Sequence, residues 1–155
     1  MFKNFLLTLV LGLLFFSCKK GGCDYDACGY TAPATEIQEV QTYLTNNSIT
    51  ATQHCSGLFY KIENPGTGSN PSACSSVTVR YKGMLQNGTV FDQATTPVSF
   101  NLGMLITSWR NGLPLIKAGG KIILYVPPSL GYGDQSNGTI PAHSILVFEV
   151  ELIAV

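Results

Sequence analysis

No motif typical of covalent catalysis is recognisable in this 155-residue chain. Its two histidines, His54 and His143, stand in no recognisable Ser/His or Cys/His motif, so we expect no covalent nucleophile. The glycine-rich run at 131–136 lacks the third glycine and the preceding strand–helix unit of a nucleotide-binding loop. What remains is a set of large, mostly aromatic side chains, each of which taken alone is more typical of a packed core: Tyr81, Phe91, Ile106, Trp109, Tyr132 and Phe148.

The cysteines indicate disulfides in an exported protein. Apart from Cys18, which ends an apolar leader, four cysteines remain, and an even number favours two disulfides with three possible pairings. We favour Cys23–Cys28, which are close in sequence, and Cys55–Cys74, which lie just outside two strands that could be neighbours. The spacings are not those of two zinc knuckles, and only the two histidines could assist, so no metal is predicted.

The first residues read as an export signal. Lys3 precedes an apolar run at 5–16, which is shorter than the roughly 20 residues of a transmembrane helix. The run ends in Phe15-Phe16-Ser17-Cys18, which looks like a loose bacterial lipobox. We therefore predict a lipoprotein signal peptide over 1–17, a lipidated Cys18 and a tether over 18–32. An ordinary signal peptide cut near Cys18 and a retained membrane anchor are the alternatives. Because Lys19 is not the aspartate that commonly retains lipoproteins at the inner membrane, we expect the outer membrane, facing the periplasm.

Length and composition bound the rest of the chain. With 155 residues it can form one domain with a substantial core plus a short appendage. Hydrophobic residues make up 45% and charged residues 12%, which excludes a disordered chain. The formal net charge is zero, which argues against binding nucleic acid through a basic surface.

The elements that must position the large side chains follow from periodicity. A helix is predicted from Pro33 within an extension at 33–54; Thr35 and Gln38 fit a capping box, and the narrow apolar stripe should pack on the domain surface. From Cys55 the pattern changes to strands, with a hairpin at Asn87-Gly88 and a short helix capped by Ser108. The strand candidates are 57–62, 77–82, 89–91, 98–102, 121–126 and 145–153. This order predicts an α+β fold: a twisted antiparallel sheet wrapped around one short helix, with an N-terminal helical extension.

Several motifs in this order resemble the FKBP-type peptidyl-prolyl isomerases over about residues 57–155. The run VTVRYKGML at 77–85, followed by NGTVFD at 87–92, is similar to the family's strand–hairpin–strand signature. LGMLI at 102–106 leading to Trp109 resembles its turn into the helix. Gly131-Tyr132-Gly133, Ile140-Pro141 and LVFEVEL at 146–152 match its C-terminal part. The resemblance implies an isomerase domain over 55–155 that uses no cofactor.

The resemblance also implies a site. In the family the large side chains named above converge on one shallow pocket with Trp109 as its floor. By this analogy the backbone N–H of Ile106 binds a substrate carbonyl, the hydroxyl of Tyr132 donates a second hydrogen bond, and Asp92 acts electrostatically beside the pocket. Further wall positions are Val98, Leu105 and Ile140.

Some positions depart from the family pattern. Val98 stands where many members have Phe, so that wall should be less aromatic. Ser108 replaces a usual glycine. Thr95 and Thr96 occupy the region of a frequent basic partner of the site carboxylate. We expect these changes to affect rate and sequence preference more than fold.

The resemblance implies proline-containing unfolded or exported polypeptides as partners, and macrolide FKBP ligands as further ones. The membrane is expected as a partner through a lipid anchor. A non-catalytic FKBP-like chaperone or partner-binding lipoprotein is the alternative function, and a purely structural lipoprotein is a third.

Overall fold

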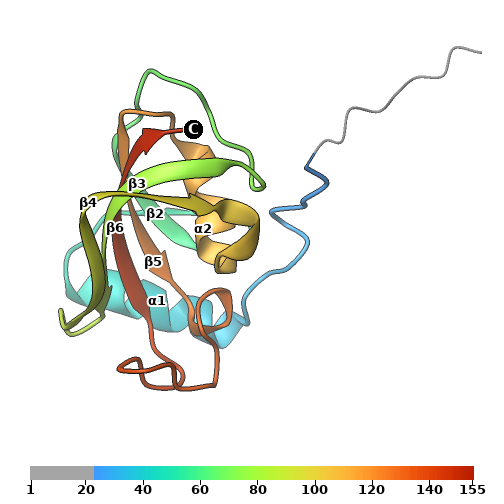
Figure 1. The fold of residues 1–155 in the computed structure, drawn as a ribbon. Coiled ribbons are helices and arrows are strands. Elements are labelled where there is room, and N and C mark those ends of the chain that lie inside the picture. Colours follow the sequence, from blue (N-terminus) through green and yellow to red (C-terminus); the bar gives the residue numbers. More distant parts are fainter. Residues whose placement is uncertain (1–22) are drawn as a thin grey trace, which may run out of the picture.

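The computed structural model describes residues 23–155, which fold around one antiparallel sheet (Figure 1). The strand order across the six-stranded sheet is β1-β2-β5-β6-β3-β4, and every neighbouring pair is antiparallel. The predicted α+β architecture is therefore confirmed. The strands are β1 (Thr52–Gln53), β2 (Phe59–Asn64), β3 (Ser76–Leu85), β4 (Val90–Asn101), β5 (Gly120–Val126) and β6 (Leu146–Ala154).

The hairpin between β3 and β4 forms at the predicted dipeptide. Gly88 has a φ of +85°, which a side chain would disfavour, and Leu85 N–H donates to the Thr89 carbonyl at 2.9 Å. The two short strands predicted after this turn are one continuous strand, β4. Proline has no backbone N–H to donate to a neighbouring strand. Pro97 is tolerated in β4 because β4 is an edge strand and has no neighbour on its outer side.

The main core lies between one face of the sheet and the short helix α2 (Thr107–Gly112). Gly112 allows the close approach, because a Cβ there would lie 2.6 Å from a Leu124 methyl group on β5. The predicted Ser108 cap is wrong: α2 begins at Thr107 with Ile106 as its N-cap residue, two residues earlier than predicted, and Ser108 is fully buried inside the helix. Three 3-10 turns complete the core: η1 (Leu102–Met104), η2 (Leu113–Leu115) and η3 (Pro128–Leu130).

The opposite face of the sheet is covered by α1 (Ala34–Asn46), drawn in cyan in Figure 1. Val40 and Leu44 are buried there against Phe59, Tyr125 and Val147 in a second apolar cluster. The narrow stripe thus packs on the domain, as predicted. The capping box does not form, because the helix starts at Ala34 after Pro33 and has no side-chain cap.

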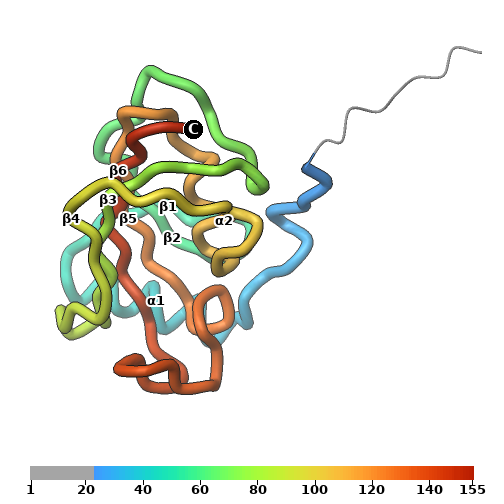
Figure 2. The backbone as a smooth tube through the Cα atoms, in the orientation of Figure 1, coloured from blue at the N-terminus to red at the C-terminus, as the bar shows by residue number. Residues whose placement is uncertain are grey.

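Residues 23–32 run along the domain beside α2 before entering α1 (Figure 2). The Tyr25 hydroxyl donates to Asn111 Oδ1 at 2.7 Å, and the Arg110 guanidinium lies 4.0 Å from the Tyr25 ring centre. Ala32 is buried in the main core, where its N–H donates to the Ser56 carbonyl at 2.9 Å. This part of the predicted tether is attached to the domain.

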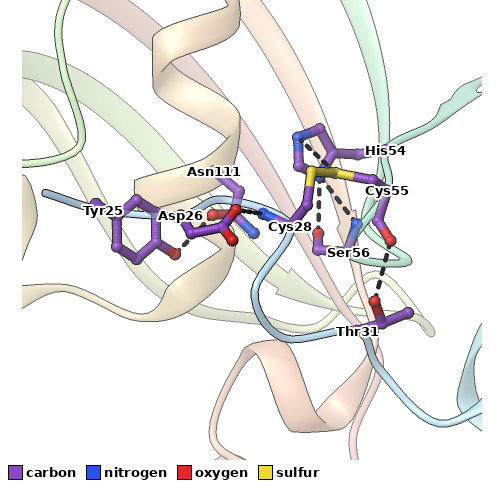
Figure 3. The surroundings of a disulfide bond; sticks show 8 residues. All are labelled: Tyr25, Asp26, Cys28, Thr31, His54, Cys55, Ser56 and Asn111. Atoms are coloured by element: carbon purple, nitrogen blue, oxygen red, sulfur yellow. Dashed lines mark hydrogen bonds between the residues drawn. A yellow bond between two sulfur atoms is a disulfide. The ribbon is translucent and has the colours of Figure 1, made fainter.

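The disulfides differ from the predicted pairing. Cys23 is bonded to Cys74 and Cys28 to Cys55, with Cα atoms 5.6 and 5.5 Å apart. The favoured Cys23–Cys28 and Cys55–Cys74 pairing is wrong, because the segment that carries the first two cysteines lies across the domain. Each of these two cysteines therefore meets a distant partner. His54 lies beside the second disulfide, with Nδ1 3.6 Å from Cys55 Sγ (Figure 3).

Within residues 23–155, no helix is long and apolar enough to cross a membrane. The predicted signal peptide and Cys18 lie outside the described residues.

Candidate functional site

A cavity of about 310 Å³ opens between α2, β3, β4 and the loop after η3. This volume lies at the lower end of the range for small-molecule sites, which runs from about 300 to 1,000 Å³. One carboxylate is found among its lining side chains, and the others are mainly aromatic or aliphatic. They are Tyr81, Phe91, Asp92, Phe100, Met104, Leu105, Ile106, Trp109, Tyr132 and Phe148.

Phe148 and Trp109 are the most deeply buried aromatic residues of the lining, with 3% and 4% of their surfaces exposed. Tyr81, Phe100 and Phe148 each meet the indole edge-to-face, with ring centres 5.3, 6.1 and 5.6 Å away. Edge-to-face contact is one of the two favoured arrangements of aromatic rings, and it stabilises the orientation of each ring. The indole is therefore fixed by its neighbours.

Phe91 and Phe148 form a second rigid corner of the cavity. Their ring centres are 5.6 Å apart at an interplanar angle of 86°. Both rings lie over Gly83 of β3, where a Cβ would stand 2.7 Å from Phe91 and 3.0 Å from Phe148. The absence of a side chain at Gly83 is thus a condition for this part of the cavity.

Asp92 is the carboxylate of the cavity, and it accepts a hydrogen bond from the Tyr81 hydroxyl at 2.6 Å. The register of β3 and β4 brings the two side chains to one face of the sheet, because Tyr81 pairs with Ala94 and Gly83 with Asp92. Burial raises the pKa of Tyr81 strongly, and the hydrogen bond and charge of Asp92 raise it further. Tyr81 is therefore a neutral donor that orients the carboxylate.

Two hydrogen-bond donors stand at the cavity from different elements. Ile106 is the N-cap residue of α2, where the backbone N–H has no partner inside the helix. Tyr132 follows η3, and 37% of the residue's surface is exposed. Burial, followed by the charge of Asp92, raises the pKa of Tyr132, so its hydroxyl keeps its proton.

The cavity gathers most of the predicted site residues but not all. The seven residues predicted as catalytic and the wall residue Leu105 line it. Val98 packs against the main core instead, and Ile140 is buried in that core with 5% of its surface exposed. Ile140 also exchanges two backbone hydrogen bonds with Asn137, both of 2.9 Å, which close the loop.

Val98 does not line the cavity, and Phe100, two residues further along β4, contributes an aromatic side chain to the wall. Val98 and Phe100 lie on the same face of β4, opposite Val79 and Val77 of β3, but of the two only Phe100 lines the cavity. Met104, 85% exposed at the rim, was also missed, although it lies inside the quoted LGMLI motif.

Comparison with known proteins agrees with this geometry. The sequence model described as FKBP-type peptidyl-prolyl cis-trans isomerase matches residues 68–153. The chain belongs to this family. The matched segment of the FKBP domain contains every residue that lines the cavity.

Curated relatives carry the same description. A probable FKBP-type isomerase of Haemophilus influenzae is 46% identical over 104 residues, which are 64% of this chain and 43% of that protein. The FKBP-type isomerase FkpA of Escherichia coli is 45% identical over 102 residues, covering 64% of this chain and 38% of FkpA. The chain thus spans less than half the length of these relatives.

Solved structures show the same fold. A peptidyl-prolyl cis-trans isomerase from Pseudomonas syringae superposes with a TM-score of 0.69 at 34% identity, over 81% of this chain and 98% of that one. FkpA from Escherichia coli gives a TM-score of 0.70 at 37% identity, over 77% and 59% of the two chains.

Proposed function

We propose that this protein accelerates cis–trans isomerisation of X–Pro peptide bonds in exported polypeptides. The observation that carries the proposal is the mainly apolar cavity, in which three aromatic rings contact Trp109 in edge-to-face geometry. A proline ring placed on this floor would be oriented without any covalent bond to the protein. The similarity to FKBP-type isomerases supports the same activity.

The cavity suits the barrier that must be lowered. Amide resonance opposes rotation with a barrier of about 18–20 kcal/mol, and the twisted transition state loses that resonance and its charge separation. An apolar site therefore favours the twisted bond over the planar, more polar one. Binding that is stronger in the transition state than in the ground state raises the rate.

The polar groups act around that apolar surface. The backbone N–H of Ile106 binds a substrate carbonyl, and the hydroxyl of Tyr132 donates a second hydrogen bond. Asp92, held by Tyr81, acts on the substrate amide through its charge. No acid–base or nucleophilic step is involved, so no histidine or cysteine has a part in the reaction.

A proline-isomerisation assay with the purified protein tests the proposal. We expect faster exchange across a varied set of X–Pro peptides, with inhibition by a macrolide FKBP ligand. A folded protein that binds these peptides without accelerating exchange would instead support a non-catalytic chaperone. Loss of turnover on His143→Ala with unchanged structure would contradict a mechanism without acid–base chemistry.

We also propose that the protein is a lipoprotein of the cell envelope, anchored through Cys18 at the outer membrane and facing the periplasm. The apolar leader and the lipobox-like FFSC at 15–18 support this localisation. In cells, Cys18→Ala should release the protein from the membrane fraction or leave it unprocessed. Cys18→Ala protein that is still processed and membrane-bound would rule out the anchor.

A further inference from the structure

One carboxylate of the N-terminal helix reaches the domain on the side of the cavity loop. Glu36, in the first turn of α1, is 7% exposed. Its Oε2 accepts a hydrogen bond from the backbone N–H of Ser129 at 2.8 Å, across 93 residues of sequence. Burying a carboxylate is costly unless it is hydrogen-bonded, and a bond of a charged acceptor to an N–H is among the stronger kinds. The position calls for an explanation beyond helix packing.

The amide that Glu36 holds also clamps the loop that carries Tyr132. The N–H of Ser129 and the carbonyl of Pro128 belong to the same planar peptide group, so fixing one fixes the other. That carbonyl accepts from Gly131 N–H at 2.9 Å and from Gly133 N–H at 2.8 Å. The two glycines flank Tyr132 directly, and they are the residues with the greatest backbone freedom.

We propose that Glu36 is a positioning residue for Tyr132. Through one rigid peptide group, the carboxylate on α1 holds both glycine N–H groups and so places the Tyr132 hydroxyl over the cavity. The inference rests on the proposed function, in which that hydroxyl donates to the substrate. It extends the site to α1, which lies outside the segment matched by the family at residues 68–153.

Three variants separate this role from simple stabilisation. Glu36→Ala removes the acceptor, and we expect kcat/KM for X–Pro peptides to fall about ten-fold, the effect of losing one hydrogen bond to a charged group. Glu36→Gln keeps an oxygen that can accept from Ser129, and should recover most of the activity. Leu44→Ala is the matched control: it deletes a fully buried side chain of the same helix, far along α1 from Glu36. It should lower the melting temperature at least as much as Glu36→Ala while changing kcat/KM less than two-fold.

A readout independent of turnover keeps the inference separate from the isomerase assignment. In Glu36→Ala, the amide NMR signals of Gly131 and Gly133 and the ring signals of Tyr132 should shift, while in Leu44→Ala they should stay close to wild type. If wild type is inactive, the proposed function fails and these signals alone decide. Unshifted signals in Glu36→Ala would overturn the positioning role. Equal losses of kcat/KM in Glu36→Ala and Leu44→Ala would overturn it as well.

Discussion

At the scale of single residues, the pocket combines one charge with a donor that aligns it. Tyr81 and Asp92 form the short hydrogen bond of the cavity, and burial keeps the tyrosine protonated. In the proposed mechanism, the negative charge of Asp92 acts on a bound amide.

Asp92→Asn tests that electrostatic role. The amide oxygen can still accept from Tyr81, so the fold should persist, but the charge is lost. We expect kcat/KM to fall about five-fold, or about 1 kcal/mol, which is typical of one modest polar interaction. Isomerisation kinetics with peptide substrates measure it. The control is Asp134→Asn, which should keep full activity. The Asp134 side chain is 86% exposed and forms a hydrogen bond with His143.

Trp109→Leu tests the floor of the cavity. Leucine keeps the core apolar but loses three edge-to-face pairs, each worth about 0.5–1.5 kcal/mol beyond burial. Affinity for proline peptides and for a macrolide ligand should fall at least ten-fold, as measured by calorimetry, while the domain stays folded. Tyr125→Leu removes a ring that is equally buried but lies on the opposite face of the sheet. It should cost stability and leave affinity unchanged; equal affinity losses would contradict the assignment of the floor.

At the scale of elements, β3 leaves room for the Phe91 and Phe148 rings because residue 83 is a glycine. Gly83→Ala would place a Cβ 2.7 Å from Phe91, which cannot be accommodated without moving that ring. We expect a loss of about 1–3 kcal/mol in the free energy of unfolding, typical of overpacking, together with a clear loss of kcat/KM in the folded protein. Denaturant titration and the isomerisation assay measure the two effects.

Gly88→Ala on the same β3–β4 hairpin is the control for that prediction. A Cβ there meets nothing within 4 Å, but the φ of +85° makes any side chain unfavourable. This variant should lose about 1 kcal/mol of stability through backbone strain and keep its kcat/KM. If Gly83→Ala behaved the same way, Gly83 would matter only for stability.

At the scale of the whole molecule, two disulfides attach the N-terminal segment to the domain. The chain-entropy relation gives roughly 3.5 kcal/mol for Cys28–Cys55 and roughly 4 kcal/mol for Cys23–Cys74, from sequence separations of 27 and 51. The first loop lies inside the second, so the combined effect is smaller than the sum. Reduction should lower the melting temperature, and scanning calorimetry with and without a dithiol measures it. An unchanged melting temperature after complete reduction would contradict this role.

The pairing itself can be read from a non-reducing digest. Cleavage after Lys, Arg and Glu separates three peptides, which contain Cys23 with Cys28, Cys55, and Cys74. The pairing in the structure holds all three together, whereas Cys23–Cys28 with Cys55–Cys74 would release the first peptide. Further cleavage at Asp26 separates Cys23 from Cys28 and distinguishes the remaining alternative. Mass spectrometry should find Cys23 with Cys74 and Cys28 with Cys55.

The sequence by itself determined the features that depend on neighbours along the chain. Alternating side chains from Val77 to Lys82 set a half-buried strand, and Asn87-Gly88 set the hairpin, because both depend on local backbone preferences. The ordered motifs were sufficient to indicate the FKBP family and most of the residues around the cavity.

Only the tertiary structure decided what depends on residues far apart. Val98 and Phe100 lie on the same face of β4, but of the two only Phe100 lines the cavity, whereas Val98 packs against the main core. The path of residues 23–32 across the domain selects the cysteine partners. The hydrogen bond from Ser129 to Glu36 spans 93 residues and leaves no periodic or motif signal. Each of these results from how elements pack on one another, which local patterns along a single chain do not specify.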